Sequence, residues 1–272
     1  MPKIDQALTH CATMELKRLL RVAGEAALAA GHLIKNRFHQ PHTIRMKGAI
    51  DLVTETDLAS EALILEILAS ETPGIPVMAE ESPQSLDVRS QPLYWVVDPL
   101  DGTTNFAHGL PHFAVSIALL DSGKPQIGAV YHPMLDELYC ASQGGGTWLN
   151  DQQVRVTRTS ELINALVATG FPYDIKQTLP TVLSQMQRVL PAVRDIRRAG
   201  AAALDLAYVA CGRLDGFYEI NLQPWDTAAG WLLVEEAGGT LSDFHGSPYS
   251  PFFPQTLATN GQLHAALLQL LQ

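Results

Sequence analysis

The sequence predicts an α+β or layered α/β fold, built as a single domain over residues 1–272 from two closely joined parts, about 1–150 and 151–272. Two observations predict this fold class. Apolar runs separated by short turns dominate the middle of the first part, which is typical of antiparallel strands, whereas strand-like and helix-like segments alternate through the second. A length of 272 residues with 47% hydrophobic side chains is enough for a sizeable core. We therefore expect a functional site between the two parts.

Two long helices are predicted in the first part. Apolar residues recur at three- and four-residue steps from Leu16 to Phe38, with lysines and arginines between them, which is the pattern of an amphipathic helix. A second helical pattern runs from about Asp57 to Glu71. Either Thr54 or Thr56 would cap its beginning, and Pro73-Gly74 would end it.

Short apolar runs bounded by turn-forming residues predict the strands. In the first part these runs are Ile75–Met78, Tyr94–Val97 and a meander of Phe113–Leu120, Ile127–His132 and Leu138–Ala141. In the second part the predicted strands are Leu166–Thr169, Phe217–Ile220, Thr240–Asp243 and Leu257–Thr259. The helices expected between them are Leu179–Leu190, Ala201–Cys211, Thr227–Glu236 and Gln262–Leu271.

The charge balance argues against two classes of partner. With 18 basic and 28 acidic side chains the formal net charge is −10, and clustered basic residues, which nucleic acids and anionic membranes require, are not visible. Cys11, Cys140 and Cys211 are far apart and lack C-x-x-C spacing, which indicates neither a zinc site nor a disulfide framework. We expect a cytoplasmic protein without a signal peptide or a membrane span.

The stretch from Trp95 to Phe106 carries the strongest chemical signal. An apolar strand ends in Asp98, the following proline is expected to stop ladder pairing, and Asp101 comes next, directly before Gly102-Thr103 at the start of a possible helix. Two carboxylates at the end of a strand can hold a hard cation such as Mg²⁺, and the free N–H groups of a helix start bind anions. The plainer interpretation is that the two aspartates only cap a turn.

Two further acidic segments favour the metal interpretation. Glu80 follows the apolar strand that ends near Ala79, and Asp226 stands at the start of an apolar helix. Taken singly, Glu80-Glu81 is an ordinary solvated strand end and Asp226 an ordinary helix cap. Three acidic ends without a balancing basic cluster repel one another unless a cation joins them.

Four segments of the chain resemble the inositol monophosphatase family, in the order expected for it. They are Asp51 to Asp57, Ala79-Glu80-Glu81-Ser82, Asp98-Pro99-Leu100-Asp101-Gly102-Thr103-Thr104-Asn105-Phe106, and Pro224-Trp225-Asp226-Thr227-Ala228-Ala229-Gly230. The resemblance extends from the first helix to about residue 260 and is to the bacterial branch in particular, that of the inositol-1-monophosphatases and extragenic-suppressor proteins. It implies an alternating α-β-α-β-α sandwich of the type shared with fructose-1,6-bisphosphatase.

The resemblance also implies a role for each motif residue. The implied metal ligands, for two or three Mg²⁺ ions, are Glu80, Asp98, the main-chain carbonyl of Leu100, Asp101 and Asp226. Glu80 and Thr103 would orient the attacking water, with Asp57 behind Thr103. The implied substrate contacts are Asp101, Gly102, Thr103, Arg198, Gly200, Ala202, Glu219 and Asp226.

Substrate selection is expected to come from the second part. Glu219 resembles the family residue that binds sugar or inositol hydroxyls, although it is alternatively an exposed strand end. Gly200 to Ala202 would allow a polyol to approach the backbone, whereas Arg198 could contact substrate, a partner subunit or only solvent. Lys47-Gly48 is expected in a loop that closes on the site.

The resemblance implies Mg²⁺-dependent hydrolysis of a phosphate monoester, with inositol 1-phosphate as the favoured substrate, by in-line attack of a metal-activated water. Divalent metals suit this slow reaction because they neutralise the phosphoryl oxygens and lower the pKa of water. The family also implies inhibition by lithium and a homodimer. Two alternatives stay open: a different phosphatase, for histidinol phosphate, a sugar phosphate or a nucleotide 3′-phosphate, and a regulatory binding protein that keeps the fold.

Overall fold

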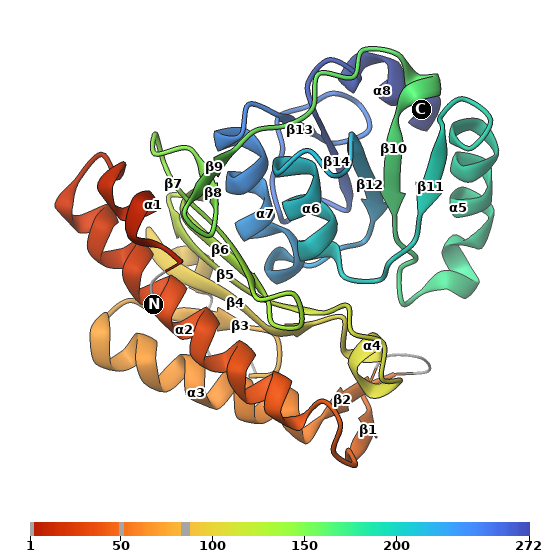
Figure 1. The fold of residues 1–272 in the computed structure, drawn as a ribbon. Helices are drawn as coiled ribbons and strands as arrows, with labels where there is room; N and C mark the ends of the chain where they lie inside the picture. Colours follow the sequence, from red (N-terminus) through yellow and green to blue (C-terminus); the bar gives the residue numbers. More distant parts are fainter. Residues whose placement is uncertain (1–2, 49–51, 83–87) are drawn as a thin grey trace.

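The computed structural model describes residues 3–48, 52–82 and 88–272, which form five alternating layers of helices and sheets (Figure 1). The first sheet has the strand order β3 (Val77–Ala79), β4 (Leu93–Asp101), β5 (Ala114–Asp121), β6 (Lys124–His132), β7 (Glu137–Ser142), β8 (Thr147–Leu149) and β9 (Gln152–Val154). The second has the order β11 (Asp195–Arg197), β10 (Leu166–Thr169), β12 (Gly216–Ile220), β14 (Gln255–Thr259) and β13 (Thr240–Ser242).

Helices form the outer and middle layers (Figure 1). The outer face of the first sheet packs against α2 (Met14–Arg37) and α3 (Glu55–Glu71), and the middle layer consists of α6 (Ala202–Ala210) and α7 (Pro224–Glu236). The far side of the second sheet packs against α5 (Ile175–Val189) and α8 (His264–Leu271). This arrangement confirms the expected α-β-α-β-α sandwich. None of the described helices is long and apolar enough to span a membrane.

Three short elements lie outside these layers. A small antiparallel sheet pairs β1 (Ile44–Met46) with β2 (Leu52–Thr54), α1 (Asp5–Thr9) lies near the start of α2, and α4 (Thr103–Ala107) follows β4. Asp51, the first residue of one family motif, lies outside the described residues.

The first sheet is covered on both faces, which explains why its strands are apolar almost throughout. Every residue of β5 from Ala114 to Leu120 is buried. Val115, Ile117 and Leu119 face α2 and α3, whereas the alternate residues face the middle layer.

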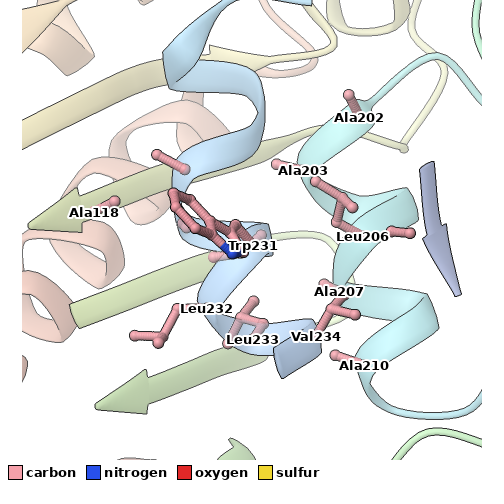
Figure 2. Packing of buried hydrophobic residues seen from close by; sticks show 14 of the residues in the cluster. Ala118, Ala202, Ala203, Leu206, Ala207, Ala210, Trp231, Leu232, Leu233 and Val234 are labelled. Atoms are coloured by element: carbon pink, nitrogen blue, oxygen red, sulfur yellow. The ribbon is translucent and has the colours of Figure 1, made fainter. Parts of the chain in front are cut away.

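Small residues let the middle helices approach each other and the sheet closely. Figure 2 shows the alanines of α6 and the side chain of Leu206 beside α7. A Cβ atom on Gly230 of α7 would lie 2.5 Å from Leu206, and one on Gly128 of β6 would lie 2.7 Å from the carbonyl oxygen of Ala229. This contact fixes the position of α7, whose first turn carries Asp226.

The structure corrects several predicted boundaries. Pro99 does not end its strand: β4 continues to Asp101, and only its register with β5 is broken between Asp98 and Asp101. Helix α5 begins at Ile175, four residues earlier than expected, and contains Pro180 as its sixth residue, where the ring removes one i→i−4 hydrogen bond. Six of the labelled helices and strands were not predicted from the sequence, namely α1, β1, β2, β8, β9 and β11.

His132 gives a testable pH dependence of stability. Burial lowers its pKa to about 4, with repulsion from His112 and Arg213 acting in the same direction and Glu137 opposing them. The folded protein therefore binds fewer protons than the unfolded chain below about pH 6.5, so stability falls as the pH falls from about 6.5 towards 4. We expect His132→Asn to reduce the loss of unfolding free energy between pH 7 and 5 by about 1 kcal/mol, after allowance for solvent screening.

Urea denaturation at the two pH values measures this difference. The exposed His245 provides the control, because His245→Asn leaves the buried histidine in place. Equal pH dependence in wild type and His132→Asn would contradict the prediction.

Candidate active site

A pocket of about 310 Å³ opens where the carboxyl ends of β3 and β4 meet the start of α7. Its lining residues are Lys47, Glu80, Asp98, Leu100, Asp101, Gly102, Thr103, Tyr173, Gln223, Trp225 and Asp226. All five predicted metal-ligand residues are among them, although they come from three segments far apart in the sequence. The pocket is thus lined by four carboxylates and one ammonium group.

The broken register of β4 is what brings Asp98 and Asp101 to the same pocket. The Leu100 N–H donates to the Asp98 Oδ1 atom at 3.0 Å, and the buried Ser60 hydroxyl donates to the Pro99 carbonyl at 2.7 Å. These two bonds satisfy main-chain groups that leave the ladder, so the irregular segment is held in one conformation.

Thr103 is fixed by two acceptors at the start of α4. Its hydroxyl lies 2.8 Å from Asp57 Oδ1 and 2.9 Å from the Leu100 carbonyl oxygen. Asp57 is fully buried and also accepts the Thr54 N–H at 2.9 Å, while Thr54 caps α3 by accepting the Thr56 N–H at 3.1 Å. The Asp57 carboxylate thereby stabilises the start of α3 and also orients the Thr103 side chain.

Glu80 follows β3 and pairs with a lysine. The Lys47 ammonium lies 2.9 Å from Glu80 Oε1 and 2.5 Å from Glu81 Oε1. Glu61, buried on α3, accepts the Glu81 N–H at 2.8 Å and the Ser82 hydroxyl, so the chain directly after Glu80 is held in place. Lys47 thus lines the pocket, whereas closure of its loop on the site stays a prediction.

The remaining two carboxylates are anchored by helix starts. Asp226 is the third residue of α7, and its Oδ2 atom accepts the Gln223 N–H at 2.7 Å. Asp101 Oδ2 accepts the Ala203 N–H of α6 at 2.8 Å. Each aspartate therefore keeps one oxygen on the protein backbone.

Burial and mutual repulsion destabilise the ionised carboxylates. The pKa of Glu80 is raised to about 7, because burial, together with the charges of Asp226 and Asp57, outweighs the opposing effect of Lys47. Burial likewise raises the pKa of Asp101 to about 7 and that of Asp98 well above its usual range. A cation bound among these groups would relieve both effects.

The donor set fits a hard divalent cation, since it consists of carboxylate and carbonyl oxygens. Within the described part of the chain, no group of three or more histidine, cysteine, aspartate or glutamate residues is arranged to hold a metal ion as it stands. The carboxylates already accept hydrogen bonds or an ion pair from the protein. A divalent ion therefore has to compete with Lys47 for Glu80.

The model of the inositol monophosphatase family matches residues 15–272. The chain belongs to the inositol monophosphatase family. Membership supports a metal-dependent phosphatase activity, generally with Mg²⁺, on a phosphorylated small molecule.

Relatives of this inositol monophosphatase family member carry two kinds of name. The protein named Nus factor SuhB from Escherichia coli K12 is 43% identical over 252 residues, covering 92% of this chain and 94% of the relative. The inositol-1-monophosphatase of Synechocystis is 44% identical over 258 residues, covering 94% and 90%. The crystal structure of the extragenic suppressor protein SuhB from Bartonella henselae superposes with a TM-score of 0.88 at 39% identity, covering 93% and 98%.

Four of the residues that the family resemblance assigned to substrate binding line the pocket, namely Asp101, Gly102, Thr103 and Asp226, whereas Arg198, Gly200, Ala202 and Glu219 are not among its lining residues. Glu219 is buried, not an exposed strand end, and a Cβ on Gly170 would collide with its carboxylate. The Arg198 guanidinium lies 5.0 Å from the centre of the Phe171 ring. Gly200 has a φ of +85°, and Ala202 begins α6.

Some pocket residues of this family member were not predicted as site residues. Tyr173, Gln223 and Trp225 line the pocket, and Asn105 links its α4 side to the 199–200 turn. Asn105 and Trp225 lie inside two of the motifs that resemble the family, and this position was the sequence feature that could have indicated a role at the site. Tyr173 lies in a loop without a motif, so no sequence pattern indicated it.

Proposed function

We propose that this chain catalyses Mg²⁺-dependent hydrolysis of inositol 1-phosphate to inositol and phosphate by in-line attack of water. The observation that carries the proposal is the pocket of about 310 Å³, into which three separate segments bring four carboxylates beside the start of α4. The favoured substrate is supported by the relative from Synechocystis named inositol-1-monophosphatase.

The proposed ligands of two or three Mg²⁺ ions are Glu80, Asp98, the Leu100 carbonyl, Asp101 and Asp226. When bound, Mg²⁺ supplies charge neutralisation of the phosphoryl group and a lowered pKa for water. The four carboxylates contribute a charge of −4, which two Mg²⁺ ions bring to zero and a third to +2. The acidic net charge of −10 therefore excludes phosphate only from the metal-free protein.

The chain's own residues position the reactants. Thr103, held by Asp57, presents its hydroxyl oxygen to the attacking water, and Glu80 orients the same water from the opposite segment. The N–H groups of Gly102 and Thr103 bind the phosphate oxygens at the start of α4. Glu219, with Gly200 and Ala202, binds the hydroxyl groups of the leaving polyol.

A phosphate-release panel tests this function. The purified protein is assayed with Mg²⁺ on inositol 1-phosphate, glycerol 2-phosphate, histidinol phosphate, fructose 1,6-bisphosphate and adenosine 3′,5′-bisphosphate, with a chelator added to matched samples. We expect the highest kcat/KM on inositol 1-phosphate and no release with chelator. A preference for another ester would retain a phosphatase but reject the substrate, and no release on any ester would reject the enzyme.

Lithium is expected to inhibit the reaction at tens of millimolar, an expectation taken from the family. The physical reason is that a monovalent ion in a Mg²⁺ position supplies half the charge that the leaving oxygen needs. Phosphate release from inositol 1-phosphate is measured against LiCl, with NaCl at equal ionic strength as the control. Equal rates in the two salts would contradict the inositol-phosphate assignment while leaving metal-dependent phosphatase chemistry intact.

A regulatory binding role is the second candidate function. The observation that favours it is the name Nus factor SuhB, carried by relatives about 43% identical to this chain. In that case the pocket would bind ions and phosphate without turnover. Calorimetry would then detect phosphate binding, while the same substrate panel would show no phosphate release.

A further inference from the structure

Asn105 joins three segments that meet beside the pocket. Its side-chain Nδ2 atom lies 2.7 Å from the carbonyl oxygen of His112, 2.9 Å from that of Ala199 and 3.3 Å from that of Gly200. The residue is 8% exposed and sits in the middle of α4. Its amide therefore connects α4, which begins at the proposed phosphate cradle formed by the N–H groups of Gly102 and Thr103, with a turn 94 residues further along the chain.

The chemistry of the three partners fixes the orientation of the amide. All three are carbonyl oxygens, which can only accept, so the nitrogen and not the oxygen of the side chain must face them. The NH₂ group has two hydrogens for three acceptors, and one hydrogen is shared. A residue without donors at this position would leave three main-chain carbonyls without this partner.

The backbone around this link is packed without spare room. Gly102 has a φ of +90°, and a Cβ on it would lie 3.1 Å from the His112 carbonyl oxygen, 3.3 Å from that of Gly200 and 3.3 Å from the Ala201 Cβ. The 199–201 turn thus lies so close to the start of α4 that a side chain at residue 102 would crowd it. We call residues 200–202, which are proposed to contact the polyol, the polyol wall. A small shift of the turn changes the distance between this wall and the N–H groups proposed to bind phosphate.

The same turn continues directly into α6. Ala202 begins that helix, and the N–H of Ala203 donates to Asp101 Oδ2 at 2.8 Å. The turn is therefore held at one end by Asn105 and at the other by Asp101. Because Asp101 is a proposed metal ligand, only the Asn105 end can be altered without changing the ligand set.

We propose that Asn105 is a specificity-determining positioning residue, which sets the distance between the phosphate cradle at Gly102-Thr103 and the polyol wall at Gly200–Ala202. This inference rests on the proposed function, because the wall matters only if a hydroxylated leaving group binds there. Asn105 itself is not among the residues that line the pocket, and its side-chain nitrogen bonds main-chain carbonyl oxygens. Its effect is to be seen in substrate choice.

The test compares Asn105→Ala and Asn105→Asp on two substrates. Inositol 1-phosphate uses the wall, whereas p-nitrophenyl phosphate has a leaving group without hydroxyls. In Asn105→Ala we expect KM for inositol 1-phosphate to rise about tenfold, with KM for p-nitrophenyl phosphate and half-saturating Mg²⁺ changed by less than about twofold. Asn105→Asp should have the larger effect, because its carboxylate repels the three carbonyl oxygens.

Asn260→Ala is the matched control. Asn260 is also buried, and its Nδ2 atom donates to Thr157 Oγ1 at 2.9 Å and to the Thr159 carbonyl at 2.8 Å, away from the pocket lining. It should lower the melting temperature without changing the KM ratio of the two substrates. An equal loss on both substrates in Asn105→Ala, or an unchanged KM ratio, would overturn the proposal in favour of a purely structural role.

A readout that does not need turnover separates this proposal from the proposed function. Amide hydrogen exchange of residues 199–203 in the metal-free protein should be faster in Asn105→Ala than in wild type and unchanged in Asn260→Ala. If wild type hydrolyses none of the esters, the proposed function fails. Unchanged hydrogen exchange of residues 199–203 in Asn105→Ala would then also reject the proposal that Asn105 holds this turn. If wild type prefers another hydroxylated ester, KM for that ester replaces KM for inositol 1-phosphate in the comparison with p-nitrophenyl phosphate. An unchanged ratio in Asn105→Ala would again overturn the proposal.

Discussion

Asp101→Asn is expected to reduce kcat by about 10³-fold or more while leaving the protein folded. The substitution removes one proposed metal-ligand charge without a change in side-chain volume. An asparagine oxygen can still accept the Ala203 N–H that Asp101 Oδ2 now accepts at 2.8 Å, so the start of α6 keeps its partner. Phosphate release over a Mg²⁺ titration measures the loss, and near-normal turnover would reject the proposed site.

The same variant should melt at a higher temperature than wild type in the absence of metal. Asp101 is buried and is repelled by Glu80, which makes its charge unfavourable until a cation is bound. Asp215→Asn is the control, because Asp215 is also a buried, hydrogen-bonded aspartate, with Thr157 Oγ1 at 2.6 Å and the Leu166 N–H at 2.7 Å. That control should lower the melting temperature and leave kcat unchanged.

The acidic part of the site could be predicted because each of its residues follows an apolar run or stands where a helix begins. Such positions are visible in the sequence as a change from an apolar run to Pro, Gly or an acidic residue. Asp98, Asp101 and Asp226 lie where this logic places them, in one pocket. What the pattern could not show is that the strand continues past Pro99 with a broken register, since that depends on Ser60, a partner 39 residues earlier.

The residue pairs of the site that escaped prediction are contacts between distant segments. Lys47 meets Glu80 33 residues later, and Asn105 meets Ala199 94 residues later. Neither spacing has a local periodicity, so no sequence pattern reports these pairs. Glu61 is a similar case: its position on α3 indicates only a polar helix residue, yet it holds the chain after Glu80.

The layer order of the fold was predicted from the family resemblance, whereas the alternation of elements alone gave only the class. Strands of the first sheet show no two-residue alternation, because helices cover both faces. The short strands β1, β2 and β11, each three residues long, are too short to produce a pattern. Their pairing is decided by the longer elements that bring them together.

Thr103→Val is expected to lower kcat by about 10²- to 10³-fold with little change in Mg²⁺ affinity. Valine keeps the volume of threonine and removes only the hydroxyl, which lies 2.8 Å from Asp57 Oδ1 and is proposed to orient the attacking water. Thr72→Val is the matched control: Thr72 is buried, and its hydroxyl lies 2.6 Å from the Leu68 carbonyl oxygen, outside the pocket lining. It should cost about 1 to 2 kcal/mol of stability and leave kcat unchanged.

A double-mutant cycle with Asp57→Asn tests whether the two residues act as one unit. Asp57 also accepts the Thr54 N–H at 2.9 Å, so Asp57→Asn should lower stability as well as kcat. If Asp57 acts only by holding the Thr103 hydroxyl, the kcat of the double variant should equal that of Thr103→Val, because no hydroxyl is left to orient. Multiplicative losses would instead show that Asp57 contributes to turnover independently of Thr103, and the assignment of Asp57 as a residue acting through Thr103 would be wrong.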